Sequence, residues 1–227
     1  MRVRTVGAGG VAALGAGVML AACAPVQMGA AAITGDQRIT QSTLAAKVSD
    51  LRDEVAKYPA GEIQLQSSQM PQAVLGWLVR FAIEDRAART AGVSVTSAEI
   101  QQGVAAIGQQ AQQYAAQSGL PDATAVLLSS GVGPQMITAL GRYQAQELSL
   151  AKKANGGKLP TTQAETDTVT SALSKGDCLA AKSLNIRINP QYGRLDYSQY
   201  TVVPGQNLLS KTVGAAPEPA TGAKPAC

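Results

Sequence analysis

Histidine is missing from the chain, which has 227 residues. Without it the protein lacks the side chain that most often serves as a general base and as a metal ligand. The sequence also has no Gly-x-Ser-x-Gly pattern and no Cys-x-x-Cys pair, so it indicates neither a serine nucleophile nor a zinc or redox site. We therefore expect a protein that is not an enzyme, with no catalytic residue, no cofactor and no metal.

Aromatic residues and concentrated charge are also scarce. With one Trp, one Phe and six Tyr, the core must be built mostly from Ala, Leu, Val and Ile, which suits packed helices better than a β-sandwich. The formal net charge is only +4 and no Lys/Arg cluster is present, so nucleic acid is not an expected partner. No strand–helix alternation appears, which disfavours a two-lobed solute-binding fold.

The segment 1–22 has the features of an export signal. Arg2 and Arg4 supply a positively charged start. Residues 6–20 form an uncharged stretch that is too short and too rich in glycine for a comfortable membrane span. Small residues then lead directly to Cys23, which suggests export followed by cleavage.

The run Leu20-Ala21-Ala22-Cys23 resembles the lipobox of bacterial lipoproteins. The resemblance implies cleavage between Ala22 and Cys23, with diacylglycerol on the Cys23 thiol and fatty acids such as palmitate in the anchor. Two or more acyl chains on one residue anchor a protein stably, whereas a single chain binds membranes only marginally. We expect a protein held by membrane lipid at the extracytoplasmic face of the cell membrane, with residues 23–29 as a tether. An ordinary signal peptide with a chance cysteine is the alternative.

Two further cysteines, Cys178 and Cys227, remain once Cys23 is assigned to lipid. Outside the cytoplasm they can form a disulfide, which would tie the C-terminal tail to the helix that carries Cys178. The tail, residues 213–227, is dominated by Pro, Ala, Gly and Thr and is expected to be disordered. A pair of free thiols is the alternative, because the sequence does not give their geometry.

Hydrophobic spacing predicts helices along most of the chain. Apolar residues recur at intervals of three and four after Thr40 and after the capping box of Thr96 and Glu99, and a second box, Thr162 and Glu165, opens a late helix. The residues expected to face the core in these three helices are Leu44, Val48, Leu51, Val55 and Tyr58; Ile100, Val104, Ile107, Ala111 and Tyr114; and Val169, Leu173, Leu179 and Ala180. Further helices are expected at about 71–91 and 134–154, with a short segment at 122–130.

Extended segments are predicted near both ends of the helical region. Residues 30–40 hold a short apolar run, a turn signal and a second extended piece. At the other end Leu184, Ile186 and Ile188 alternate with polar residues, a period of two that predicts a strand. The stretch 191–203 is expected to be irregular or extended.

The first of these segments resembles a known motif. Residues 31–40 read AAITGDQRIT, in which Ile33, Gly35, Ile39 and Thr40 fit the pattern a-V-N-G-x-x-I-T. That pattern precedes the first helix in the SurA-like N-terminal domain of exported peptidyl-prolyl isomerase chaperones, a group that includes SurA, PrsA and trigger-factor relatives.

The second motif lies near the other end. Residues 188–193 read INPQYG and are similar to the N-P-R-F/Y-G motif of some relatives, with Gln191 where Arg is common. The likeness spans about residues 30–200. It implies a mainly α fold over residues 30–212: a SurA-like multi-helix bundle with a small two-stranded β element that joins the N- and C-terminal ends.

The resemblance also implies a function. Residues 155–162 leave no room for a parvulin isomerase domain, and its paired histidines cannot exist, so only a chaperone-like module that binds unfolded or newly exported polypeptides is implied. Met70, Trp77, Met136 and Tyr143 are candidates to line a peptide-binding groove, because Met adapts to varied partners; the alternative is that they fill the core. A structural lipoprotein that binds one defined cell-envelope partner is the alternative function.

One group of charges lies within the second predicted helix. Glu84 and Asp85 stand among Arg80, Arg86 and Arg89. We interpret them as intrahelical ion pairs, each worth a few tenths of a kcal/mol. No cleft with perturbed carboxylates is therefore expected.

Overall fold

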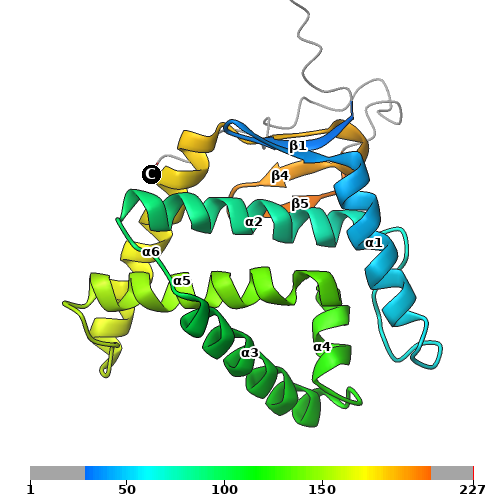
Figure 1. Ribbon diagram of the computed structural model, residues 1–227, viewed down its shortest axis with the longest axis horizontal. Helices are drawn as coiled ribbons and strands as arrows, with labels where there is room; N and C mark the ends of the chain where they lie inside the picture. The colour runs from blue at the N-terminus through cyan, green and yellow to red at the C-terminus, as the bar shows by residue number, and fades with distance from the viewer. Residues whose placement is uncertain (1–28, 206–226) are drawn as a thin grey trace, which may run out of the picture.

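The computed structural model describes residues 29–205 and residue 227, and within them the fold is mainly helical, as the composition predicts (Figure 1). The expectations for the signal segment, for Cys23 and for residues 213–226 lie outside the described residues. The helical elements are α1 (Gln41–Val55), α2 (Met70–Thr90), α3 (Ser97–Ser118), α4 (Ala123–Ser129), η2 (Pro134–Met136), α5 (Ile137–Ala154), α6 (Gln163–Leu184) and η3 (Pro190–Tyr192).

Local hydrogen bonds confirm the predicted helix starts. Thr40 Oγ1 accepts a hydrogen bond from the Thr43 N–H at 3.0 Å and so caps α1. Both predicted capping boxes form, one at the start of α3 and one at the start of α6. Gly119 and Asn185 follow α3 and α6 in the left-handed backbone conformation, which ends each helix.

The central helix is α2. In Figure 1 it crosses the middle of the molecule, with the strands on one side and α5 on the other. Its fully buried residues include Val74, Leu75 and Val79, which belong to a core shared with α1, α5 and α6. On the far side of α5, α3 crosses so closely that a Cβ added to Gly103 would lie 2.3 Å from the Gly141 carbonyl oxygen.

The apolar stripe of α3 is covered only in part. Ala111 is buried, but Tyr114 is 56 % exposed, so the prediction that Tyr114 faces the core is wrong. The helix packs chiefly on α4 and α5 at the edge of the molecule (Figure 1). These two helices therefore cover less of the α3 surface than the spacing of its apolar residues predicts.

A three-stranded sheet joins the two ends of the described chain. β1 (Ala30–Thr34) lies between β2 (Gln37–Thr40) and β3 (Arg187–Ile188), and both pairings are antiparallel. The joining of the ends is as predicted, but with three strands instead of two. Leu184 is the last residue of α6 and not part of a strand, because the left-handed turn at Asn185 delays the extended chain until Arg187.

The stretch after β3 forms a separate hairpin of β4 (Arg194–Asp196) and β5 (Thr201–Val203). The INPQYG motif fastens it to the first strand, since Asn189 Nδ2 donates to the Ala30 carbonyl at 3.0 Å. Gly193 has a positive φ, and a Cβ there would lie 2.1 Å from the Val203 carbonyl oxygen. The motif therefore needs glycine at this position for the hairpin to close.

None of the described helices is by itself long and apolar enough to cross a membrane. The segments Ala123–Ser129 and Pro134–Ala154, bent by 84° relative to each other, meet that criterion together by length and composition alone.

Candidate functional site

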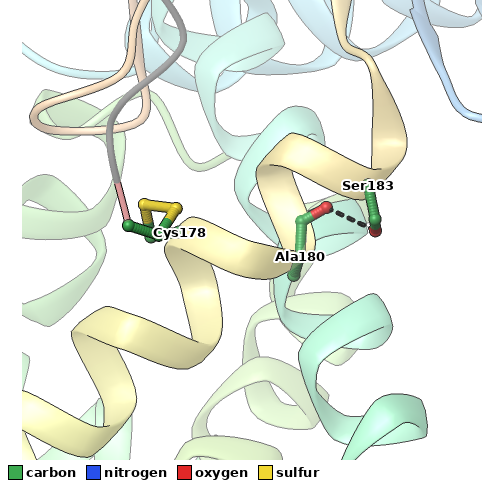
Figure 2. Close-up of a disulfide and its surroundings, with 4 residues drawn as sticks. Cys178, Ala180 and Ser183 are labelled. Atoms are coloured by element: carbon green, nitrogen blue, oxygen red, sulfur yellow. Dashed lines mark hydrogen bonds between the residues drawn. A yellow bond between two sulfur atoms is a disulfide. The ribbon is translucent and has the colours of Figure 1, made fainter.

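The last residue of the chain is bonded to α6. Cys178 and Cys227, 49 positions apart, form a disulfide with their Cα atoms separated by 5.8 Å. Figure 2 shows this bond on α6, five residues before Ser183, whose Oγ donates to the Ala180 carbonyl at 2.8 Å. Of the two states that the sequence left open, the structure has the disulfide.

Two of the four predicted groove residues lie in the core. Met70 and Met136 are 2 % and 1 % exposed, so the prediction that they line an open peptide groove is wrong. Met70 begins α2 on its buried side and Met136 ends the turn before α5. At both junctions a long, flexible side chain fills the irregular space between elements.

The other two predicted residues belong to an aromatic cluster between α2 and α5. The Trp77 ring centroid lies 5.7 Å from that of Phe81 and 6.2 Å from that of Tyr143. The Trp77 indole N–H donates to the Ser130 carbonyl at 2.8 Å. These contacts hold the two helices together, and Tyr143 also borders the cavity described below.

An apolar groove of about 410 Å³ opens elsewhere, between the C-terminal half of α2, the end of α5 and α6. These three elements meet on one side of the molecule in Figure 1. The polar residues of its lining are Arg86, Thr90, Lys153, Asp177 and Ser183. Its apolar lining consists of Ala87, Ala91, Leu150, Ala154, Ala172, Leu173, Leu179 and Ala180.

The α6 wall of the groove is exposed. Leu179 is 50 % exposed, so the prediction that it faces the core is wrong. A Cβ added to the neighbouring Gly176 would meet nothing within 4 Å, which shows that this part of the wall is open. Small residues on α6 therefore leave open space beside Leu179.

Beside the groove three carboxylates from three helices lie close enough to influence one another: Glu84 of α2, Glu147 of α5 and Asp177 of α6. Glu84 is only 4 % exposed, and its Oε1 has no hydrogen-bond partner. Within residues 29–205 and 227, none of the three forms an ion pair with a lysine or arginine.

The predicted intrahelical pairs around Glu84 are not present in the described structure. Arg86 Nε donates instead to Ser183 Oγ at 3.1 Å, and Asp85 Oδ1 accepts from Gln146 Nε2 at 2.8 Å. Arg80 Nη2 donates to the Gln199 carbonyl at 2.7 Å. Partners on other elements thus compete successfully with the weak attraction between neighbours on one helix.

This environment raises the pKa of each carboxyl group. Burial, followed by the charges of Asp177 and Glu147, raises the pKa of Glu84 to about 8. Burial and the charge of Glu147 raise the pKa of Asp177 to about 6, and burial raises the pKa of Glu147. At neutral pH Glu84 is therefore mostly protonated while Asp177 is mostly ionised.

Glu84 and Asp177 face a second, smaller space, which we call the acidic cavity. It has a volume of about 170 Å³, and Asp177 lines both this cavity and the groove, so the two spaces adjoin. Tyr200, in the turn between β4 and β5, has a left-handed backbone with a positive φ, which is unusual for a bulky side chain. The full lining is Arg80, Ile83, Glu84, Tyr143, Asp177, Gln199 and Tyr200.

Sequence reasoning missed this cavity, although α2 carries a signal for it. The buried residues of its second half are Ile83, Glu84, Ala87 and Ala88, so Glu84 interrupts an otherwise apolar face. In the described part of the chain no group of three or more Asp, Glu, His or Cys side chains is arranged to hold a metal ion.

Comparison with known proteins returns no relative: no protein family, curated protein or solved structure matches the chain.

Proposed function

We propose that the protein is a membrane-anchored lipoprotein that binds unfolded or newly exported polypeptide segments in the apolar groove. In this proposal lipid on Cys23 holds the folded part at the extracytoplasmic face of the cell membrane, through the short tether that precedes β1. The protein acts by binding and not by catalysis.

The observation that carries the proposal is the groove itself. Its walls are mainly small and aliphatic residues from three helices, with a half-exposed Leu179, and its polar residues are Arg86, Thr90, Lys153, Asp177 and Ser183. Aliphatic walls discriminate little between apolar side chains, because one methylene more or less changes binding by only about 1–3 kcal/mol. A groove of this kind suits clients of varied sequence.

The proposal predicts that Leu179→Ser removes most of the protein's ability to keep a denatured client soluble. Light scattering by a diluted, unfolded client protein measures this, with wild-type and variant at equal excess. Leu148→Ser is the matched control, since Leu148 is an exposed leucine on α5 outside the groove lining and should leave the effect unchanged. Unchanged aggregation in the presence of excess wild-type protein would contradict the proposal.

The anchor is tested separately. Cys23→Ser removes the thiol that the lipid would occupy, so the protein is expected to move from the membrane fraction to the soluble fraction of fractionated cells. Cys227→Ser is the control, because it removes a different cysteine without affecting lipidation. Retention of the Cys23→Ser protein in the membrane fraction would refute the lipid anchor while leaving the groove hypothesis intact.

A further inference from the structure

The acidic cavity brings together carboxyl groups that form no ion pair with a lysine or arginine among residues 29–205 and 227. Protein interiors seldom hold carboxylates unless these are paired, since an isolated buried charge is costly. Here Glu84 is buried with an unpartnered oxygen, and Asp177 and Glu147 lie near it without an ion-pair partner among the described residues.

Arg80, which also lines the cavity, is engaged elsewhere. Its guanidinium carbon lies 5.3 Å from the centre of the Trp77 ring, and its Nη2 donates to the Gln199 carbonyl. Both contacts hold the guanidinium beside the aromatic cluster and the β4–β5 turn. In the part of the chain that the structure describes, the carboxylates therefore have no ion pair with a lysine or arginine.

We propose that the acidic cavity receives the cationic side chain of a lysine or arginine from a polypeptide whose apolar residues lie in the adjoining groove. This inference rests on the proposed function and narrows its substrate class to apolar segments that contain a basic residue.

Size and position favour a single side chain as the occupant. At about 170 Å³ the cavity is smaller than the roughly 300–1,000 Å³ typical of sites for whole small molecules. Asp177 borders both spaces, so a chain lying along the groove can direct one side chain past it. Tyr143 and Tyr200 add aromatic rings to the lining, and aromatic rings attract ammonium and guanidinium groups.

Entry of a cation is coupled to proton release. The groups that influence Glu84 are Arg80 and Asp85 on its own helix, Tyr143 and Glu147 on α5, Asp177 on α6, and Tyr200 in the β4–β5 turn. A cation among them favours the ionised carboxylates, so a bound basic side chain displaces the proton that Glu84 holds at neutral pH. Affinity for a basic segment should therefore rise with pH between 6 and 8.

The test compares two labelled peptides by fluorescence anisotropy, Ser-Leu-Leu-Lys-Leu-Leu-Ser and the same peptide with Gln in place of Lys. Wild-type protein at pH 8 is expected to bind the lysine peptide roughly tenfold more tightly, the scale of one charge-assisted contact. The preference should shrink as the pH falls to 6, while affinity for the glutamine peptide stays constant.

Two isosteric variants locate the preference. Glu84→Gln, which lies outside the groove lining, should bring the two affinities close together without weakening the glutamine peptide. Asp177→Asn should also reduce the preference for the lysine peptide, and Asp53→Asn, at an exposed position on α1, should retain it. Circular dichroism confirms that the variants fold. Equal affinity of wild-type protein for both peptides would overturn this inference and leave the proposed function standing. If neither peptide binds to the wild-type protein, both this inference and the proposed function are contradicted.

Discussion

The two halves of α2 lie in opposite surroundings. In the first half Met70, Val74 and Leu75 are enclosed by the core. In the second half Glu84 lines the acidic cavity and Ala87 lines the apolar groove. One helix therefore joins a closed region that provides stability to an open region with an apolar groove and a buried carboxyl group beside a cavity. Strongly perturbed carboxylates and open apolar surface in the same region are typical of functional sites.

The largest expected effect concerns the disulfide, which fixes the C-terminus to the helix that forms one wall of the open region. The double variant Cys178→Ser/Cys227→Ser should lower the free energy of unfolding by about 4 kcal/mol, because the unfolded chain regains the entropy of the long loop between the two cysteines. Urea unfolding of the full protein measures the loss. Cys23→Ser is the control and should change nothing; an unchanged midpoint in the double variant would show that α6 does not depend on the bond.

The next effect contrasts a leucine from each region. Leu75→Ala should lower the free energy of unfolding by about 3 kcal/mol, since it removes a fully buried side chain and leaves a cavity. Leu179→Ser should lower it by less than about 1 kcal/mol, because half of that side chain is already in water. Urea titrations of both variants measure the difference. Similar losses at the two positions would show that the groove wall is part of the core.

Glu84→Gln should have a smaller effect, and it should raise the free energy of unfolding. The folded pKa of Glu84 is raised from 4.5 to about 8, so its contribution to stability is complete below about pH 4.5 and declines as the pH rises to 8. At pH 7 the wild type has lost about 3 kcal/mol of this contribution. In the variant, the glutamine amide lacks some of its hydrogen bonds, which costs roughly 1 kcal/mol. A net gain of about 2 kcal/mol at pH 7 is expected.

Urea unfolding at pH 5 and at pH 7 measures this effect. The gain in Glu84→Gln should be present at pH 7 and nearly absent at pH 5, whereas Asp53→Asn should leave the pH dependence of the wild type unchanged. A variant less stable than the wild type at pH 7 would show that Glu84 is ionised and paired in the folded protein.

Local features of the sequence predicted the helix starts and the joining of the two ends well. Thr40 and the two capping boxes fixed the starts of three helices, because a cap depends on residues three positions apart. The joining of the two extended ends was also predicted. The third strand was not, because β3 is only two residues long and its pairing depends on the position of β1.

The open region was harder to predict, because it depends on how the helices sit against one another. Leu179 belongs to a regular apolar stripe and gives no local sign that its neighbours leave it exposed. Glu84 has three arginines near it in the sequence, so the local pattern indicates an ion-paired residue and not a buried, unpaired carboxyl group. Asp177 lies far along the chain from it, and nothing in the sequence indicates that the two carboxylates meet.

Hydrogen exchange with and without a saturating apolar, lysine-containing peptide tests the central claim most directly. Peptide binding in the groove predicts slower exchange confined to the end of α2, the end of α5 and the second half of α6, with the first half of α2 and α3 unchanged. Protection of α3 around the exposed Tyr114 instead, or no protection at saturation, would contradict the groove as the binding site.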